Sequence, residues 1–193
     1  LQEMKKKSVA IIPLRKGSKG IPGKNKKKIL GRRLYQWCLG EAIFSNLDEV
    51  YVFTDDDEII DQVTKEYQWS KKVIVLKRSS ENANDTASTE SAMIEFAEEI
   101  NWDFDQLCLL QATSPLTTRQ DINNVLSKIS KSDYNSALTV VNTKRFIWNS
   151  DAESINYDYK NRPRRQNFEG LIMENGAVYA INKNQFKKSK NRL

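Results

Sequence analysis

The sequence predicts an α/β fold in which a mostly parallel sheet lies between two layers of helices. The first observation is that short β-branched apolar runs alternate with segments whose apolar residues recur at helical spacing. The second is that the first run, residues 8–13 (SVAIIP), is almost wholly apolar, which is typical of a strand buried on both faces. The third is that 193 residues, 39% of them hydrophobic, suit one domain with one core.

Each element follows from its local pattern. Strands are expected where β-branched and apolar residues cluster in short runs, and helices where apolar residues recur every three or four positions. The predicted order is a strand at 8–13, a helix at 34–44, a strand at 50–54, a helix at 56–67, a strand at 73–76, a helix at 86–100, a strand at 107–110, a helix at 119–130, and strands at 136–141 and 176–181. Asp55 is the expected N-cap of the second helix, and Asp85 or Thr86 that of the third.

Two stretches depart from this alternation. Residues 14–33 form a loop rich in Gly and Lys that is longer than a simple connection requires, and such loops are usually functional. Residues 143–170 are polar, with many Asn, Arg and aromatic residues and no clean period. We interpret this second stretch as an arm that leaves the core and is used in subunit contact.

The positive charge of the chain is concentrated in one segment. The net charge is +6, but the segment up to Arg33 holds twelve Lys or Arg residues against Glu3 alone, whereas beyond it nineteen basic residues face twenty-four acidic ones. Such a run can be a solvated tail, a site for an anionic ligand or a nucleic-acid contact. Only Tyr35 and Trp37 lie nearby as stacking residues, both in a predicted helix, so we expect no nucleic-acid binding.

Histidine is absent from the chain, which excludes Ser-His-Asp triads, Cys-His pairs and imidazole general bases. Cys38 and Cys108 stand in no metal-ligand spacing, so we expect both to be reduced core residues. No apolar run approaches the roughly 20 residues that span a bilayer, and the N-terminal segment lacks the features of a secretory signal. A cytoplasmic protein without membrane contact is therefore expected.

The loop after the first predicted strand has the composition of a polyphosphate cradle. It reads LRKGSKGIPGKN over residues 14–25. Its three glycines allow the backbone to approach a ligand closely, and Arg15, Lys19 and Lys24 add positive charge. The spacing matches neither the Walker A motif nor G-x-G-x-x-G, because Asn25 stands where the first requires Ser or Thr and Lys19 where the second requires Gly.

Six short motifs occur in order along the chain. They are IIPLRKGSKGIPGKN at 11–25, FTD at 53–55, DTAST at 85–89, LQATSPL at 110–116, RRQ at 164–166 and ENGAVY at 174–179. Together they resemble the cytidylyltransferases that activate acidic sugars, especially the CMP-sialic acid synthetases (acylneuraminate cytidylyltransferases). The resemblance implies one nucleotidyltransferase domain over residues 1–193, with a three-layer α/β/α, Rossmann-like fold of the nucleotide-diphospho-sugar transferase type.

The resemblance also implies the reaction: CMP passes from CTP to the anomeric hydroxyl of a sialic-acid-like ulosonic acid, and pyrophosphate is released. Such transfer needs positioning and charge neutralisation more than covalent chemistry, so it does not require histidine. The implied catalytic residues are Arg15, Lys19 and Lys24. The implied CTP-binding residues are Arg15, Gly17, Ser18, Lys19, Gly20, Lys24, Asn25, Arg78, Ala87 and Thr89, and the implied sugar-binding residues are Gln111, Arg165, Asn175 and Tyr179.

A divalent metal, Mg²⁺ or Mn²⁺, and a homodimer formed through residues 143–170 are further implications of the resemblance. Family members carry an acidic metal-binding pair beyond the Asn-Gly strand, and the sequence ends at Leu193 before that point. We therefore assign no metal-binding residue and expect the C-terminal part of the family's domain to be missing. Two alternatives stay open: a nucleotidyltransferase for another sugar or sugar phosphate, and a catalytically impaired homologue that binds nucleotide.

Overall fold

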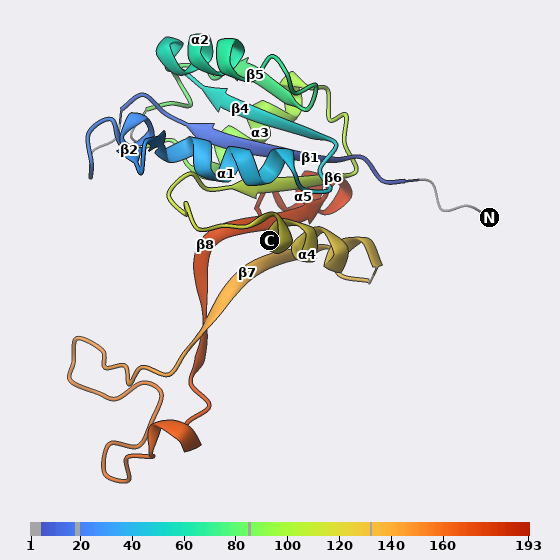
Figure 1. The fold of residues 1–193 in the computed structure, drawn as a ribbon. Helices are drawn as coiled ribbons and strands as arrows, with labels where there is room; N and C mark the ends of the chain where they lie inside the picture. The colour runs from blue at the N-terminus through green and yellow to red at the C-terminus, as the bar shows by residue number, and fades with distance from the viewer. Residues whose placement is uncertain (1–4, 18–19, 85, 132) are drawn as a thin grey trace. The chain divides into compact units, whose positions relative to one another are not determined.

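The computed structural model describes residues 5–17, 20–84, 86–131 and 133–193, and within them six strands form one sheet in the order β5-β4-β1-β6-β8-β7 (Figure 1). β1 (Ser8–Leu14) lies between β4 (Glu49–Thr54) and β6 (Gln106–Leu110) and is parallel to both. β5 (Val73–Lys77) is parallel to β4, and β8 (Leu171–Asn182) is antiparallel to β6. The mostly parallel sheet predicted from the sequence is confirmed.

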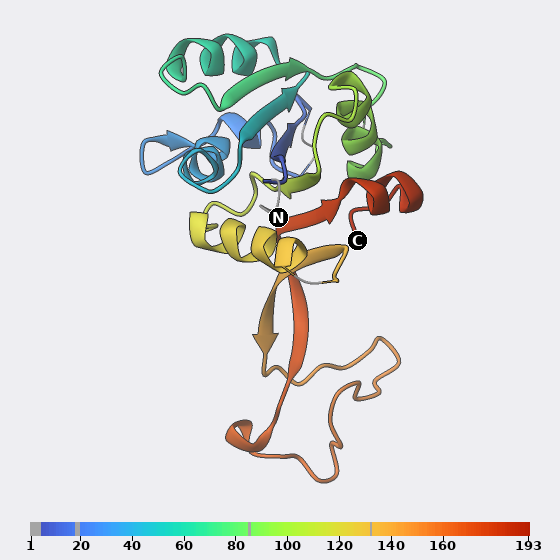
Figure 2. The same cartoon turned by 90° about the vertical axis from the view of Figure 1, so that its right-hand side faces the viewer.

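Helices cover both faces of this sheet (Figure 2). The helices are α1 (Leu34–Ile43), α2 (Asp57–Glu66), α3 (Thr89–Glu99), α4 (Arg119–Lys131) and α5 (Lys183–Ser189), and the edge strand is β7 (Ser136–Thr143). Side chains of α1, α2 and α4 pack against one face, and side chains of α3 and α5 pack against the other. The three-layer α/β/α architecture is therefore confirmed as well.

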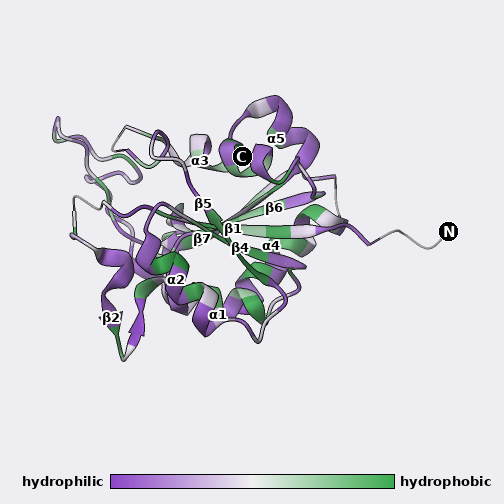
Figure 3. Cartoon of the chain, turned by 90° about the horizontal axis from the view of Figure 1, so that it is seen from above, coloured by the Kyte–Doolittle hydropathy of each residue, from purple (hydrophilic) through white to green (hydrophobic). Residues whose placement is uncertain are grey.

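Alternation along β1 explains why this strand lies at the centre of the core. Ala10 and Ile12 face the layer of α1, α2 and α4, whereas Val9 and Ile11 face the layer of α3 and α5, and all four are fully buried. Successive side chains of a strand point to opposite faces, so a strand that is apolar throughout needs a layer on each side. Hydrophobic residues accordingly gather on the central strands (Figure 3).

The structure also tests the expectations that both cysteines are reduced core residues and that no segment spans a membrane. Cys38 and Cys108 are both buried and free, as the sequence predicted. Cys38 on α1 and Cys108 on β6 belong to the same core cluster, between the sheet and the layer of α1, α2 and α4. Within the described residues, no helix combines the length and the apolar character needed to cross a bilayer.

The third helix begins later than the sequence predicted. The expected range was 86–100, but α3 starts at Thr89 because Ser88 is its N-cap and accepts the Ser91 N–H at 2.9 Å. Thr86 is therefore not the cap, and Asp85, the other candidate, lies outside the described residues. A cap side chain that accepts a free N–H of the first turn decides where the helix begins.

The cap of α2 is also one residue later than predicted. Asp56, not Asp55, accepts the Glu58 N–H, at 3.1 Å. Asp55 instead accepts the backbone N–H of Lys16 at 2.7 Å. Asp56 therefore caps α2, whereas Asp55 binds the backbone of the basic loop, residues 14–33.

Several short elements were missed by the sequence analysis, among them a 3-10 turn in the arm, Arg165–Asn167. The 14–33 loop contains a 3-10 turn, Lys24–Lys26, and a small hairpin formed by β2 (Lys28–Ile29) and β3 (Arg32–Arg33). The two residues at the tip of that hairpin have positive φ, as tight hairpins require, although Leu-Gly is not the usual pair. α5 was missed because Phe186 is its one buried residue among those described.

The chain divides into two compact units, here called the core unit (Leu1–Leu138 and Ala177–Leu193) and the arm unit (Thr139–Gly176). The arm unit includes residues 143–170, the predicted arm. Its own packing is aromatic: the Phe146 ring centroid lies 4.4 Å from that of Tyr157 and 4.9 Å from that of Phe168. The guanidinium carbon of Arg162 lies 4.3 Å from the Phe146 centroid, within cation–π distance.

Candidate functional site

A cavity of about 270 Å³ opens in the core unit where chain segments leave the carboxyl ends of β1, β5 and β6. In open α/β sheets, ligands bind at this edge because the loops after parallel strands meet there. The N-terminal end of α3 completes the wall. The lining residues are Pro13, Arg15, Lys24, Asn25, Arg78, Ala87, Ser88, Thr89, Ala92, Gln111, Ala112 and Thr113.

This cavity brings together residues that the sequence predicted from four separate segments. Those in the lining are Arg15, Lys24, Asn25, Arg78, Ala87, Thr89 and Gln111. Gly17 and Gly20 are described but are not among the lining residues, and Ser18 and Lys19 lie outside the described residues. Their predicted roles stay predictions.

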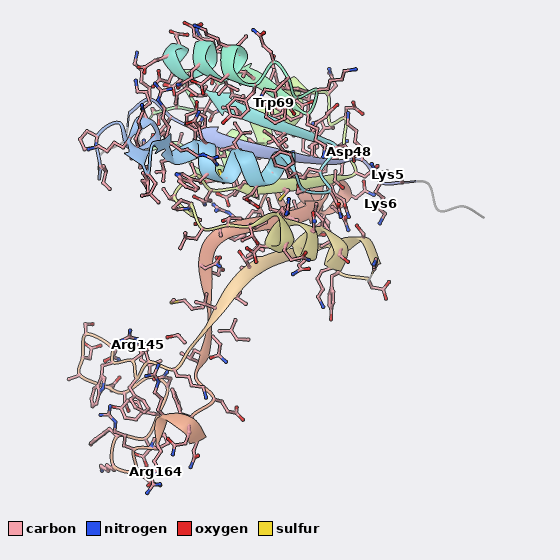
Figure 4. All side chains as sticks on the ribbon, viewed as in Figure 1. Lys5, Lys6, Asp48, Trp69, Arg145 and Arg164 are labelled. Carbon is pink, nitrogen blue, oxygen red and sulfur yellow. The ribbon has the colours of Figure 1, made fainter. Side chains whose placement is uncertain are left out.

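The remaining predicted sugar contacts lie elsewhere. Tyr179 is 5% exposed, packs in the core against α3 and α5, and is not among the lining residues of the cavity. Arg165 and Asn175 belong to the arm unit. Arg165 lines a second cavity of about 600 Å³ there, beside Lys144, Arg145 and Arg162, and Figure 4 shows Arg145 and Arg164 on this unit. The predicted contacts of these residues with a sugar stay predictions.

The charged side chains of the described cavity lining are all cationic: Arg15, Lys24 and Arg78. Burial lowers the pKa of the Arg78 guanidinium, the charges of Glu95 and Asp55 oppose that shift, and the charge of Arg15 adds to it. An arginine nevertheless keeps its proton in proteins. Three cations that share a small cavity repel one another, so an anionic ligand would relieve their repulsion.

The acidic start of α2 holds the basic loop in place. Lys26 Nζ lies 3.1 Å from Asp56 Oδ2 and 2.7 Å from Glu58 Oε2. These hydrogen bonds, first with Glu58 and then with Asp56, raise the pKa of Lys26. Arg33 Nη2 also approaches Glu58, at 3.7 Å. Part of the positive charge near the N-terminus therefore fixes the loop rather than facing a ligand, and Lys5 likewise pairs with Asp48 (Figure 4).

Asn25 ties the middle of the loop at residues 14–33 to its beginning. Its side chain is 6% exposed, and its Nδ2 donates a hydrogen bond to the Arg15 carbonyl oxygen at 3.2 Å. Gly23, with φ of +62°, allows the left-handed turn from which the Lys24–Lys26 turn begins. The backbones of Arg15 and of the turn that contains Lys24, two residues of the cavity lining, are thereby tied together.

Asn84 organises the turn that leads to residues 87–89 of the cavity lining, and it was missed by the sequence analysis. Its Oδ1 accepts hydrogen bonds from the Thr86 N–H at 2.9 Å, the Thr86 hydroxyl at 2.8 Å and the Ala87 N–H at 2.8 Å. Its carbonyl oxygen accepts from Arg15 Nη1 at 3.3 Å. Asparagine side chains commonly accept hydrogen bonds from the backbone two or three residues later. This preference was the signal in the sequence from which the turn at Asn84 could have been predicted.

The described residues do not fit a metal site held by the protein. Among them, no group of three His, Cys, Asp or Glu side chains is arranged to hold a metal ion. The described lining of the cavity also contains no carboxylate. Mg²⁺ is usually bound by one or two carboxylates together with phosphate oxygens and water. We therefore assign no described residue to the expected Mg²⁺ or Mn²⁺.

The known proteins to which this chain is similar in sequence are cytidylyltransferases. The sequence matches the family model described as "Cytidylyltransferase" over residues 9–190. N-acylneuraminate cytidylyltransferase B of Danio rerio is 39% identical over 177 residues, which are 88% of this chain and 40% of that protein. Pseudaminic acid cytidylyltransferase of Campylobacter jejuni strain 81-176 is 30% identical over 180 residues, covering 90% of this chain and 77% of that protein. This chain thus spans about two fifths of the length of the curated fish relative.

A solved structure is similar in fold. The structure of CMP:2-keto-3-deoxy-manno-octonic acid synthetase complexed with CTP matches with a TM-score of 0.66 at 21% sequence identity. The match covers 94% of this chain and 77% of that one. It supports the Rossmann-like α/β architecture built above.

Proposed function

This chain belongs to the cytidylyltransferase family, and we propose that it transfers CMP from CTP to the anomeric hydroxyl of an acidic ulosonic sugar of the sialic acid class, with release of pyrophosphate. The observation that carries the proposal is the cavity in which Arg15, Lys24 and Arg78 meet, with no carboxylate among its described lining residues. The names of the relatives, N-acylneuraminate and pseudaminic acid cytidylyltransferase, support an acidic sugar as the acceptor.

The cavity divides naturally into a phosphate side and a base side. Arg15 and Lys24 come from the loop after β1 and bind the triphosphate. Arg78 comes from the segment after β5 and, with Ala87 and Thr89, binds the cytosine. A guanidinium only donates hydrogen bonds, which suits O2 and N3 of cytosine, whereas the exocyclic amine requires an acceptor such as the Thr89 hydroxyl.

In the proposed reaction, the anomeric hydroxyl loses its proton to solvent and its oxygen forms a bond to the α-phosphorus of CTP. The bond from that phosphorus to the bridging oxygen of the β-phosphate breaks, and its electron pair leaves with pyrophosphate. Negative charge builds on the departing pyrophosphate, and Lys24 and Arg15 stabilise it where it develops. Gln111, at the end of β6, contacts the sugar acid from within the same cavity. A Mg²⁺ or Mn²⁺ ion carried by the triphosphate would neutralise part of its charge, and no described residue is assigned to hold that ion.

A coupled assay of pyrophosphate release tests this function. We expect release from CTP when N-acetylneuraminate or a related ulosonic acid is supplied with Mg²⁺, and little release when UTP replaces CTP or when the sugar is omitted. Absence of release with every one of several ulosonic acids, or equal release with neutral sugar phosphates, would contradict the proposal.

We also propose that the chain forms a homodimer through its arm unit and acts in the cytoplasm. Large apolar side chains are exposed on the arm unit, and such patches are typical of interaction surfaces. They are Val140, Val141, Trp148, Ile155, Tyr159, Leu171, Ile172 and Met173. The buried, free Cys38 and Cys108 suit a reducing compartment.

Replacing Ile172 with aspartate should convert the dimer to a monomer. Ile172 is 75% exposed in the structure, so the substitution leaves the fold intact while placing a charge in the proposed apolar contact. Light scattering after gel filtration should give about twice the chain mass of 22.3 kDa for the unmodified protein and the single mass for Ile172→Asp. Ser150→Asp, which adds the same charge at an exposed polar position of the arm unit, is the control and should stay dimeric. A monomeric unmodified protein would refute the assembly.

A further inference from the structure

A single carboxylate of α3 holds the turn that follows β5. Glu95 accepts hydrogen bonds through both of its oxygens, from the Ser79 N–H at 2.7 Å and from the Ser79 hydroxyl at 3.1 Å. The preceding residue, Arg78, begins this turn, and its backbone N–H donates to the Thr54 carbonyl oxygen at 2.9 Å. The turn is thus tied to a helix on one side and to β4 on the other.

The hydrogen bonds continue from Ser79 to the guanidinium of Arg78. The Asn82 N–H donates to the Ser79 hydroxyl at 3.2 Å, and Arg78 Nη2 donates to the Asn82 carbonyl oxygen. Glu95, Ser79 and Asn82 therefore form a connected path that ends on the side chain of Arg78. Each group in this path is hydrogen-bonded to the next. A shift of Ser79 would therefore move Asn82, whose carbonyl oxygen holds the Arg78 guanidinium.

The side chain of Arg78 has a buried hydrogen-bond donor without a partner in the described part of the chain. It lines the cavity and is 6% exposed, yet its Nε has no hydrogen-bond partner among the described residues. A buried donor without a partner costs free energy, so such a donor in a cavity wall points to a ligand that accepts a hydrogen bond there. The guanidinium of Arg78 is in turn held by the Asn82 carbonyl oxygen, so the turn controls where this side chain points.

We propose that Glu95 is a positioning residue that, through Ser79 and Asn82, aims Arg78 at the nucleotide base and so sets the preference for cytosine over uracil. This inference rests on the proposed function. Cytosine offers two acceptors, O2 and N3, to the donors of Arg78, whereas N3 of uracil carries a hydrogen and repels them. Discrimination between the two bases therefore depends on where the guanidinium points, while the triphosphate that both nucleotides share is bound by other residues.

The test is calorimetric titration of CTP and of UTP into the 193-residue protein and its Glu95→Ala variant. We expect Glu95→Ala to weaken CTP binding about tenfold, in line with the loss of one charge-assisted hydrogen bond, and to change UTP binding less than twofold. Glu95→Gln keeps an oxygen acceptor for the Ser79 N–H and should recover most of the CTP affinity. Glu98→Ala, at an exposed position of the same helix, is the matched control and should leave both affinities unchanged.

The outcomes separate the inference from the function on which it rests. Equal weakening for CTP and UTP, or no weakening for either, would overturn the role of Glu95 while leaving CTP binding in place. An unmodified protein that binds neither nucleotide would overturn the proposed function and the inference with it. Should Glu95→Ala fail to fold, Ser79→Ala removes the next group in the path and should show the same selective loss for CTP.

Discussion

Replacing Lys24 with alanine is expected to lower kcat/KM for pyrophosphate release by about 100- to 1,000-fold, the range found when one donor to a developing anion is removed. Lys24 lines the cavity, in the 3-10 turn that Gly23 begins and Asn25 holds against Arg15. The backbone of Lys24 is thus held at the wall of the cavity in which we propose that pyrophosphate leaves. The measurement is steady-state kinetics with CTP and a ulosonic acid.

The control for this substitution is Lys28→Ala in the same basic segment. Lys28 is exposed, lies in the small β2–β3 hairpin and is not among the residues that line the cavity. We expect its removal to change kcat/KM by less than about threefold, because exposed charges are largely screened by salt. Equal losses for Lys24→Ala and Lys28→Ala would mean that the total charge of the segment, not the cavity, supports the reaction.

Replacing Gly170 with alanine is expected to disrupt the packing of the arm unit. Gly170 has φ of +82°, and a Cβ atom built on it would lie 2.4 Å from the Thr143 carbonyl oxygen and 2.9 Å from Asn142 Oδ1. The new methyl group therefore meets backbone that cannot turn away like the end of a flexible side chain. We expect the variant to lose most of the hydrogen-exchange protection of the arm amides, including those near Phe168.

Gly176→Ala separates the steric clash from the cost of the backbone conformation. Gly176 also has a positive φ, +70°, but nothing lies within 4 Å of a Cβ built on it. That variant should lose only the roughly 1–2 kcal/mol that an L residue costs in a left-handed conformation. Similar protection in the two variants would show that the chain around Thr143 shifts easily and that Gly170 is not required by close packing.

The regular part of the fold was predictable because its signals are local. The unbroken apolar run of β1 predicted its burial between two layers, and the helical spacing of α1, α2 and α4 predicted their existence. The cap of α3 was not predictable, since DTAST offers several residues of the capping type and only the hydrogen bond of Ser88 decides among them. The β2–β3 hairpin was missed because two-residue strands of mostly charged residues show no alternation.

The candidate site was predictable in part for a similar reason. Arg15 and Lys24 stand in one Gly-rich loop, so composition alone indicated an anion site, whereas Arg78 was predicted only through the family resemblance. Asn84 and Glu95 were missed because their tasks depend on partners that the fold brings close. Tyr179 lies on a returning strand where an aromatic residue fits either the core or a pocket, and the structure places it in the core.

The central claim is that the cavity at the carboxyl ends of β1, β5 and β6 is a CTP site. A crystal structure of the protein grown with CTP tests it most directly. The account predicts the cytosine within hydrogen-bonding distance of Arg78 and Thr89, and the triphosphate against Arg15 and Lys24. CTP bound elsewhere on the chain, or seated in the cavity with its triphosphate against Arg78 and its base toward Lys24, would contradict the account.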